Sequence, residues 1–190
     1  MSKIALTPNA SGSGTFTIAA PNSNTDRTLT LPDEAGTVLT SASSQVAGPA
    51  FSAYKSGSSQ TLTSGVVTRI TYESEDFDTN DCFASSTFTP TVAGYYQLNV
   101  LTYGLATSGG IDSLEIRLYK NGGLYQILSK IHSSRTSGDY GDLIASGSTV
   151  VYSNGTDSWE VYVRSYAGSN ISISAGRFYN NFNGCLVRTA

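Results

Sequence analysis

The stretch from Ser86 to Val100 constrains the fold more than any other part of the chain. Phe88 lies in a short extended run that ends at Pro90, because proline has a fixed φ and no N–H for a sheet ladder. A turn follows, for which Gly94 offers backbone freedom, and every second residue from Tyr96 onward then shares one face of a strand. This face and Phe88 are expected to pack against each other across two sheets, as in the middle of a β-sandwich.

Composition favours strands and turns over helices. Only 13% of the 190 residues are charged, whereas 19 are glycine and 12 are tyrosine, and no window of about ten residues has a helical apolar stripe. The net charge of -3 provides no basic surface for nucleic acid. No apolar run approaches the about 20 residues of a membrane-spanning helix, so we expect an all-β protein without membrane insertion, made in the cytoplasm.

Residues 1–48 and 49–190 are predicted to be separate domains. The first segment contains three short predicted strands, at residues 15–18, 28–31 and 36–39. Each offers two or three apolar side chains, too few to hold a core, so this arm is expected to wind with other copies or to dock on a larger body. A connector of small residues, 40–49, separates the arm from the head.

The head shows strand patterns at the spacing of a sandwich or barrel. The predicted strands are residues 50–54, 66–72, 95–103, 113–120, 123–131, 148–152, 158–165, 170–174 and 177–187. Asn121 and Gly122 accept the positive φ of a type I′ turn and predict one hairpin. The run from Ser153 to Thr156 predicts a second hairpin.

The arm contains a long pattern, G-x-F-T-I-x-x-P-N-x-N-x-x-R-T-L-T-L-P-D-x-x-G-T, from Gly14 to Thr37. This pattern resembles a passage frequent in bacteriophage tail-fibre and other virion proteins. The resemblance implies that the arm attaches the chain to a virus particle.

Seven short motifs follow one another in the head. They are Phe51-Ser52-Ala53, Phe88-Thr89-Pro90, Gly94-Tyr95-Tyr96, Leu118 to Gly122, Ser146-Gly147-Ser148, Trp159 to Val163, and Asn181 to Val187 with Phe182 and Gly184. In this order and spacing, residues 50–188 resemble the globular domain of the C1q family, a jelly roll shared with the tumour necrosis factor (TNF) superfamily. The resemblance implies a C1q/TNF-like jelly-roll β-sandwich that forms a homotrimer. The collagen stalk of the vertebrate proteins is missing, so the arm would serve as the trimerising or docking piece.

The residues provide no catalytic set. His132 is the only histidine, and the chain has no G-x-S-x-G serine elbow. We therefore predict that the protein is not an enzyme and needs no cofactor.

One acidic run resembles a calcium loop in part. Asp76, Asp78 and Asn80 occupy the positions of the opening ligands, but Asp81 replaces the sixth-position glycine and Thr87 the twelfth-position glutamate. A solvated acidic loop is the expectation, with calcium binding as the alternative.

The two cysteines have no metal-binding spacing. Cys82 and Cys185 lie about a hundred residues apart. Free buried thiols are expected, and a disulfide between them is the alternative.

Tyrosines near strand ends or in Gly/Ser-rich passages suggest a receptor-contact surface. They are Tyr103, Tyr125, Tyr140, Tyr166 and Tyr179. Rings flanked by Asn, Ser and Asp suit saccharides, because a sugar face stacks while its hydroxyls form hydrogen bonds. The contact candidates are Tyr140, Asp139, Asp142 and Tyr125. The alternative is that most of these tyrosines line sheets or a trimer axis.

Together these features predict a virion protein: a phage tail-fibre or spike subunit whose arm binds other virion proteins and whose head binds a glycan or protein of the host surface. Weak contacts repeated over several heads would give firm attachment. A capsid or tail decoration protein is the main alternative, and a polysaccharide depolymerase is a further one.

Overall fold

The computed structural model describes residues 10–15, 17, 19, 22–26, 28, 48–106, 108, 110–133 and 141–190. The chain divides into two compact units, Met1–Leu39 and Thr40–Ala190. The strands predicted in the arm include residues outside the described ones. They stay predictions, as does the domain boundary between residues 48 and 49.

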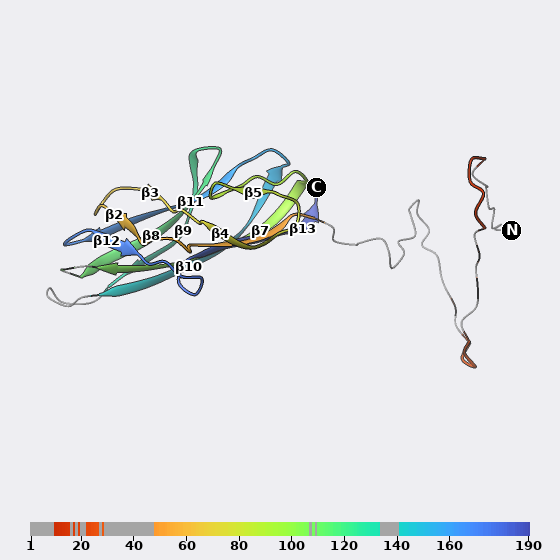
Figure 1. The fold of residues 1–190 in the computed structure, drawn as a ribbon, viewed down its shortest axis with the longest axis horizontal. Helices are drawn as coiled ribbons and strands as arrows, with labels where there is room; N and C mark the ends of the chain where they lie inside the picture. The colour runs from red at the N-terminus through yellow and green to blue at the C-terminus, as the bar shows by residue number, and fades with distance from the viewer. Residues whose placement is uncertain are drawn as a thin grey trace. The chain divides into compact units, whose positions relative to one another are not determined.

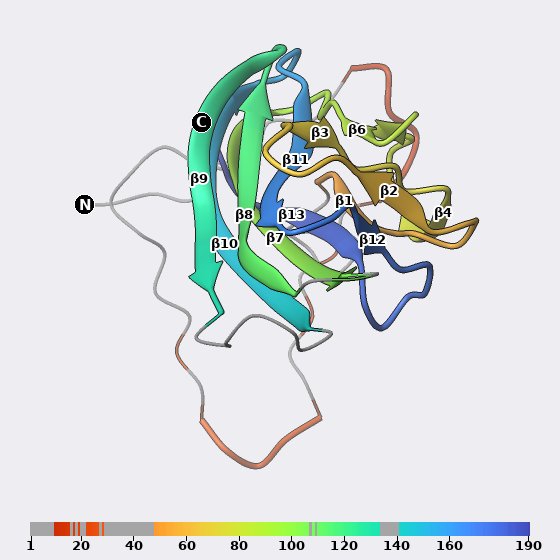
Figure 2. The ribbon, with the colours of Figure 1, turned by 90° about the vertical axis from the view of Figure 1, so that its left-hand side faces the viewer.

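The second unit consists of two antiparallel sheets packed face to face (Figures 1 and 2). Sheet A contains β10 (Asp142–Asn154), β7 (Ala93–Ala106), β13 (Asn181–Thr189), β1 (Ala50–Tyr54) and β4 (Ser74–Asp78). β12 (Ile171–Ile173) also pairs with β7, and β2 (Gln60–Leu62) pairs with β12. Sheet B contains β5 (Phe83–Ala84), β6 (Thr87–Phe88), β11 (Trp159–Ala167), β8 (Ile111–Lys120) and β9 (Gly123–His132), with β3 (Thr68–Arg69) also beside β11. The described part of the chain contains no apolar helix of membrane-spanning length.

The core lies between the two sheets and is centred on β7. Its inward-facing residues Tyr96, Leu98 and Val100 are buried, as the alternation predicts. Phe88 comes from sheet B, and its ring meets that of Tyr96 edge-on at 5.5 Å. The predicted packing of Phe88 on this face of β7 is therefore confirmed.

An aromatic cluster joins the sheets around Phe51. Its ring stacks on Phe83 at 4.9 Å and on Phe88 at 4.3 Å, and Phe182 approaches it edge-on at 4.9 Å. Phe51, Phe88 and Phe182 are fully buried. Since aromatic rings bury large areas, this cluster contributes a large share of the sandwich's stability.

The two predicted hairpins have different outcomes. Asn121 and Gly122 have φ values of 51° and 78° and join β8 to β9, which confirms the first hairpin. The second prediction is wrong, because β10 pairs with β7 in sheet A whereas β11 lies in sheet B. Asn154 Oδ1 accepts hydrogen bonds from the N–H groups of Thr156 and Asp157, both at 2.9 Å. This turn is a corner at which the chain changes sheets.

Gly94 is essential for a reason other than the predicted turn. It lies inside β7, and Pro90 lies in the connection that precedes this strand. A Cβ atom on Gly94 would stand 2.5 Å from the carbonyl oxygen of Arg188 and 2.6 Å from Leu186 Cδ1. Close approach of β7 and β13 therefore requires glycine here.

Two other strand predictions need correction. Residues 66–72 contain only the two-residue strand β3. The acidic run, expected to be a solvated loop, forms β4, which pairs with β1. β4 stands at the edge of sheet A, where charged side chains can face water.

The chain enters and leaves the sandwich at the same end. Leu186 N–H donates to Pro49 C=O at 2.9 Å, just before β1 begins, and Ala190 N–H donates to Ala93 C=O at 3.2 Å. We call this the proximal end. The β7–β8 and β12–β13 connections and the start of β10 lie at the opposite, distal end.

Candidate functional site

The outer face of sheet B is occupied by contacts within the subunit. Arg69 pairs with Glu160 at 3.0 Å, and Arg117 pairs with Glu115. The rings of Tyr119 and Tyr162 stack at 4.0 Å. These charged groups and rings therefore have partners within the same subunit, as expected of a sheet face that meets solvent.

The outer face of sheet A carries instead a chain of hydrogen-bonded amides. Asn99 lies at its centre: its Oδ1 accepts from Ser148 Oγ at 2.9 Å, and its Nδ2 donates to Asn183 Oδ1 at 3.0 Å. Gln97 donates to Ser148 and to Asn99, and Asn183 donates to Asn181. We call Gln97, Asn99, Ser148, Asn181 and Asn183 the amide patch.

Exposed apolar side chains surround the amide patch on the same face. They are Tyr95 and Leu105 of β7, Ile144, Val150 and Tyr152 of β10, and Phe77 of β4. The rings of Tyr95 and Tyr152 lie 5.6 Å apart across the β7–β10 pair. A monomer gains nothing from exposing so many apolar groups on one face, so the arrangement is typical of an interaction surface.

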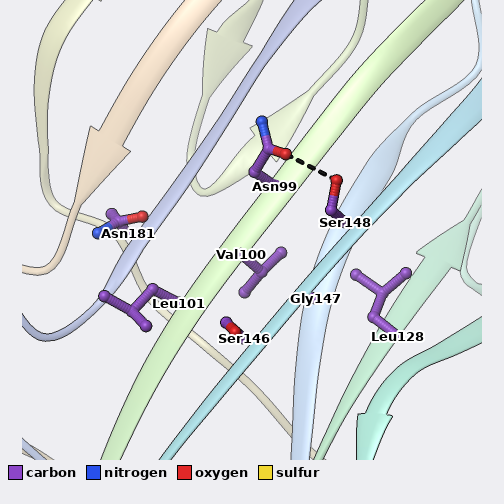
Figure 3. Close-up of a pocket in the computed structure, with 8 residues that line it drawn as sticks. All are labelled: Asn99, Val100, Leu101, Leu128, Ser146, Gly147, Ser148 and Asn181. Atoms are coloured by element: carbon purple, nitrogen blue, oxygen red, sulfur yellow. Dashed lines mark hydrogen bonds between the residues drawn. The ribbon is translucent and has the colours of Figure 1, made fainter.

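Two shallow hollows lie on this surface. One, of ≈ 510 Å³, is lined by Asn99, Val100, Leu101, Leu128, Ser146, Gly147, Ser148 and Asn181 (Figure 3). The other, of ≈ 290 Å³, is lined by Ala50, Phe51, Ser52, Phe77, Asn99, Asn183, Gly184 and Cys185. Neither lining includes a carboxylate or a histidine, so both hollows suit packing and hydrogen bonding rather than acid–base chemistry.

The free edges of the two sheets meet beside this surface. In the described part of the chain, β10 pairs only with β7 and β9 only with β8, and β9 and β10 run side by side (Figure 2). β9 exposes Leu124, Tyr125 and Ile127. An apolar double edge of this kind is suited to contact with another chain.

The predicted calcium ligands are already hydrogen-bonded within the protein. Asp76 pairs with Arg177 at 2.7 Å and accepts from Ser52 Oγ at 3.1 Å. Asp78 accepts the Phe83 N–H at 2.6 Å. No group of three His, Cys, Asp or Glu side chains that could hold a metal occurs within the described ranges. Calcium binding at Asp76, Asp78 and Asn80 stays an untested alternative.

Both cysteines are free, so the alternative disulfide is not formed. Cys82 is buried, as expected. The expectation of a buried thiol is wrong for Cys185, because the alternation of β13 turns Gly184 and Leu186 inward and Cys185 outward.

The structure describes two of the four predicted receptor-contact residues, Asp142 and Tyr125. Tyr140 and Asp139 lie outside the described residues. Asp142 begins β10 at the distal end, whereas Tyr125 lies near the proximal end of β9 and meets Trp159 edge-on at 5.1 Å. The structure therefore separates Asp142 from Tyr125.

Asp142 instead lies near Tyr103, another tyrosine of the broader set. The carboxylate of Asp142 is near enough to raise the pKa of the Tyr103 hydroxyl, and the rings of Tyr103 and Tyr179 lie 5.1 Å apart. The local sequence carries no signal for this pairing, because the three residues come from three different parts of the chain. The Gly/Ser-rich flanks and the position near a strand end are the only features that single out Tyr103 and Tyr179.

Comparisons with known proteins concern the fold alone. No protein-family model and no curated protein matches the sequence. The structure is similar to the globular domain of zebrafish complement 1qA, at 20% identity and a TM-score of 0.49, covering 75% of this chain and 99% of that one.

Two further neighbours carry the fold assignment. The Eiger TNF of S. frugiperda matches at 11% identity with a TM-score of 0.58, covering 75% of this chain and 95% of that one. Murine APRIL at pH 8.0 matches at 9% identity with a TM-score of 0.53, covering 73% and 98%. The described head residues therefore fold as the C1q/TNF-like jelly-roll β-sandwich that the sequence predicts.

Proposed function

We propose that the protein is a homotrimeric phage tail-fibre or spike subunit that binds the host surface through its head. The observation that carries the assembly is the exposed outer face of sheet A, with its amide patch and surrounding apolar side chains. Support for the virion role comes from the passage Gly14 to Thr37, which resembles tail-fibre sequences. The role is one of binding rather than catalysis.

The assembly joins unlike surfaces. The double edge formed by β9 and β10 of one copy packs against the next copy over the amide patch and the proximal part of the outer face of sheet A, so the contact is heterologous and closes as a ring. Exposed apolar side chains of the edge then lose contact with water, and polar groups of the amide patch keep hydrogen-bond partners. Three copies is the number that the C1q/TNF resemblance implies.

The trimer gives the first prediction. The purified full-length protein is expected to have three times the 20.0 kDa mass of one chain in light scattering. Val150→Glu is expected to shift it to monomers, because three carboxylates would lose water at the interface. Val66→Glu is the matched control, since Val66 is 50% exposed compared with 54% for Val150 and lies away from sheet A's outer face. A monomeric wild-type protein at micromolar concentration would contradict the proposal.

The arm gives the second prediction. Virions assembled with a chain lacking residues 1–48 are expected to lack this protein, whereas full-length chains are incorporated. Immunogold electron microscopy with antibodies against the protein measures incorporation and position together. Label on fibres or the tail supports attachment, label spread over the capsid favours the decoration role, and incorporation without the arm would contradict the arm's assignment.

A further inference from the structure

Tyr103 and Tyr179 form an aromatic shelf at the distal end of sheet A. Tyr103 projects from the outer face of β7, and Tyr179 comes from the connection between β12 and β13. Their ring centroids are 5.1 Å apart and the ring planes are inclined by 36°. Tyr179 is 47% exposed, so much of this aromatic surface is open to a ligand.

A carboxylate borders the shelf. Asp142 lies one step along the sheet from Tyr103, since Tyr103 is paired with Ile144 and Leu105 with Asp142. Burial raises the pKa of the Tyr103 hydroxyl, and the nearby carboxylate of Asp142 raises it further. The exposed carboxylate keeps acceptor sites for additional donors.

The shelf is held in place by the buried side chain of Asn180. Its Oδ1 accepts the Tyr103 N–H at 2.9 Å, and its Nδ2 donates to Ser174 C=O at 2.6 Å. Nearby, Gly176 has a φ of 134°, and a Cβ atom there would stand 2.9 Å from Tyr179 Cδ2. The backbone that carries Tyr103 is therefore joined to the β12–β13 connection before a ligand arrives, which lowers the entropic cost of binding.

The charge of the shelf limits the class of ligand. Arg177, on the same connection as Tyr179, is paired with Asp76 at 2.7 Å and lies over the Tyr54 ring at 5.7 Å. The shelf residues themselves contribute one negative charge and no positive one. A ligand with an apolar ring face and several hydroxyl donors fits this surface, whereas an anionic sugar is repelled by Asp142.

We propose that Tyr103, Tyr179 and Asp142 bind a neutral sugar residue of a cell-surface glycan. The sugar face packs on the Tyr179 ring, and its hydroxyls donate to the Asp142 carboxylate. This inference rests on the proposed attachment function and names its ligand class. Within the head, the shelf lies at the distal end, opposite to Pro49 and Ala190.

An array of neutral and acidic bacterial oligosaccharides tests the shelf with the full-length protein. The wild type is expected to bind neutral members, Tyr179→Ala to bind them about tenfold more weakly, and Tyr179→Phe to retain binding because the ring is kept. Tyr166→Ala is the matched control: Tyr166 is 40% exposed on β11 of the other sheet, and it is expected to leave binding unchanged. Asp142→Ala is expected to weaken binding as well.

Three results would overturn the inference. They are no binding of the wild type to any saccharide, binding confined to acidic members, and an equal loss in Tyr179→Ala and Tyr166→Ala. Light scattering of the same variants tests whether a second copy of the chain, rather than a sugar, occupies the shelf. If Tyr179→Ala dissociates the trimer, the shelf is a subunit contact and not a glycan site.

Binding of the labelled protein to bacterial cells separates this inference from the proposed function. Periodate cleaves sugar diols, so cells treated with it are expected to bind much less of the labelled protein. If the protein still binds the treated cells, the attachment function stands and the saccharide inference fails. If it binds neither treated nor untreated cells of strains that the virus infects, the attachment function itself fails.

Discussion

Replacing Phe51 by alanine is expected to lower the free energy of unfolding by about 3–5 kcal/mol, the usual cost of removing a buried ring. Phe51 is fully buried and touches the rings of Phe83, Phe88 and Phe182, so its loss opens a cavity between both sheets. For a domain of this size the melting midpoint should fall by about 10 °C or more. Thermal unfolding followed by circular dichroism at one fixed protein concentration measures the change.

The control for Phe51→Ala is Phe178→Ala. Phe178 is 84% exposed, so removal of its ring is expected to change stability by less than about 0.5 kcal/mol. Equal melting midpoints for the two variants would show that the aromatic cluster does not join the sheets as described.

Gly94→Val is expected to be nearly as damaging, through crowding rather than a cavity. The new Cβ would lie 2.5 Å from the Arg188 carbonyl oxygen and 3.2 Å from Thr189 Cα, and these backbone atoms cannot rotate away. β7 and β13 must then separate, at a cost near the upper end of the about 1–3 kcal/mol typical of overpacking. The melting midpoint measures this as well.

Gly123→Val is the matched control for Gly94→Val. Its Cβ would come no closer than 3.6 Å to Lys120 C=O, and Gly123 lies on the exposed start of β9. Valine suits a strand, so stability should stay close to that of the wild type. A Gly94→Val protein as stable as Gly123→Val would contradict the close approach of β7 to β13.

The sequence predicted the elements whose signals are local. Alternation along β7 identified its buried face, and Asn121 with Gly122 identified the β8–β9 hairpin. The corner after Asn154 shows the limit of such signals. The same turn residues serve a hairpin and a corner, and the difference depends on partners far along the chain, β7 for β10 and β8 for β11.

The edge strand β4 was missed for a related reason. Its residues are acidic and exposed, and charged runs are depleted from strands in general. Pairing with β1 holds this segment extended, and such pairing cannot be detected from the residues of β4 alone. Gly94 shows the opposite case: the sequence identified the residue, but the constraint comes from the neighbouring strand and not from a turn.

One residue of the candidate site could be identified from the sequence, but its geometry could not. Tyrosines beside polar residues indicated a saccharide surface, and Asp142 belonged to the predicted set. Its partners, Tyr103 and Tyr179, are assembled by the sheet register and by the side chain of Asn180. Tyr125 has similar flanks but lies at the other end of the head, on a ring contact with Trp159.

The shared position of Pro49 and Ala190 at the proximal end has a practical consequence. A reporter or affinity tag fused after Ala190 would emerge beside the arm junction. Proteins immobilised through such a tag would all present their distal loops outward, in the same orientation, to a cell suspension or a glycan solution.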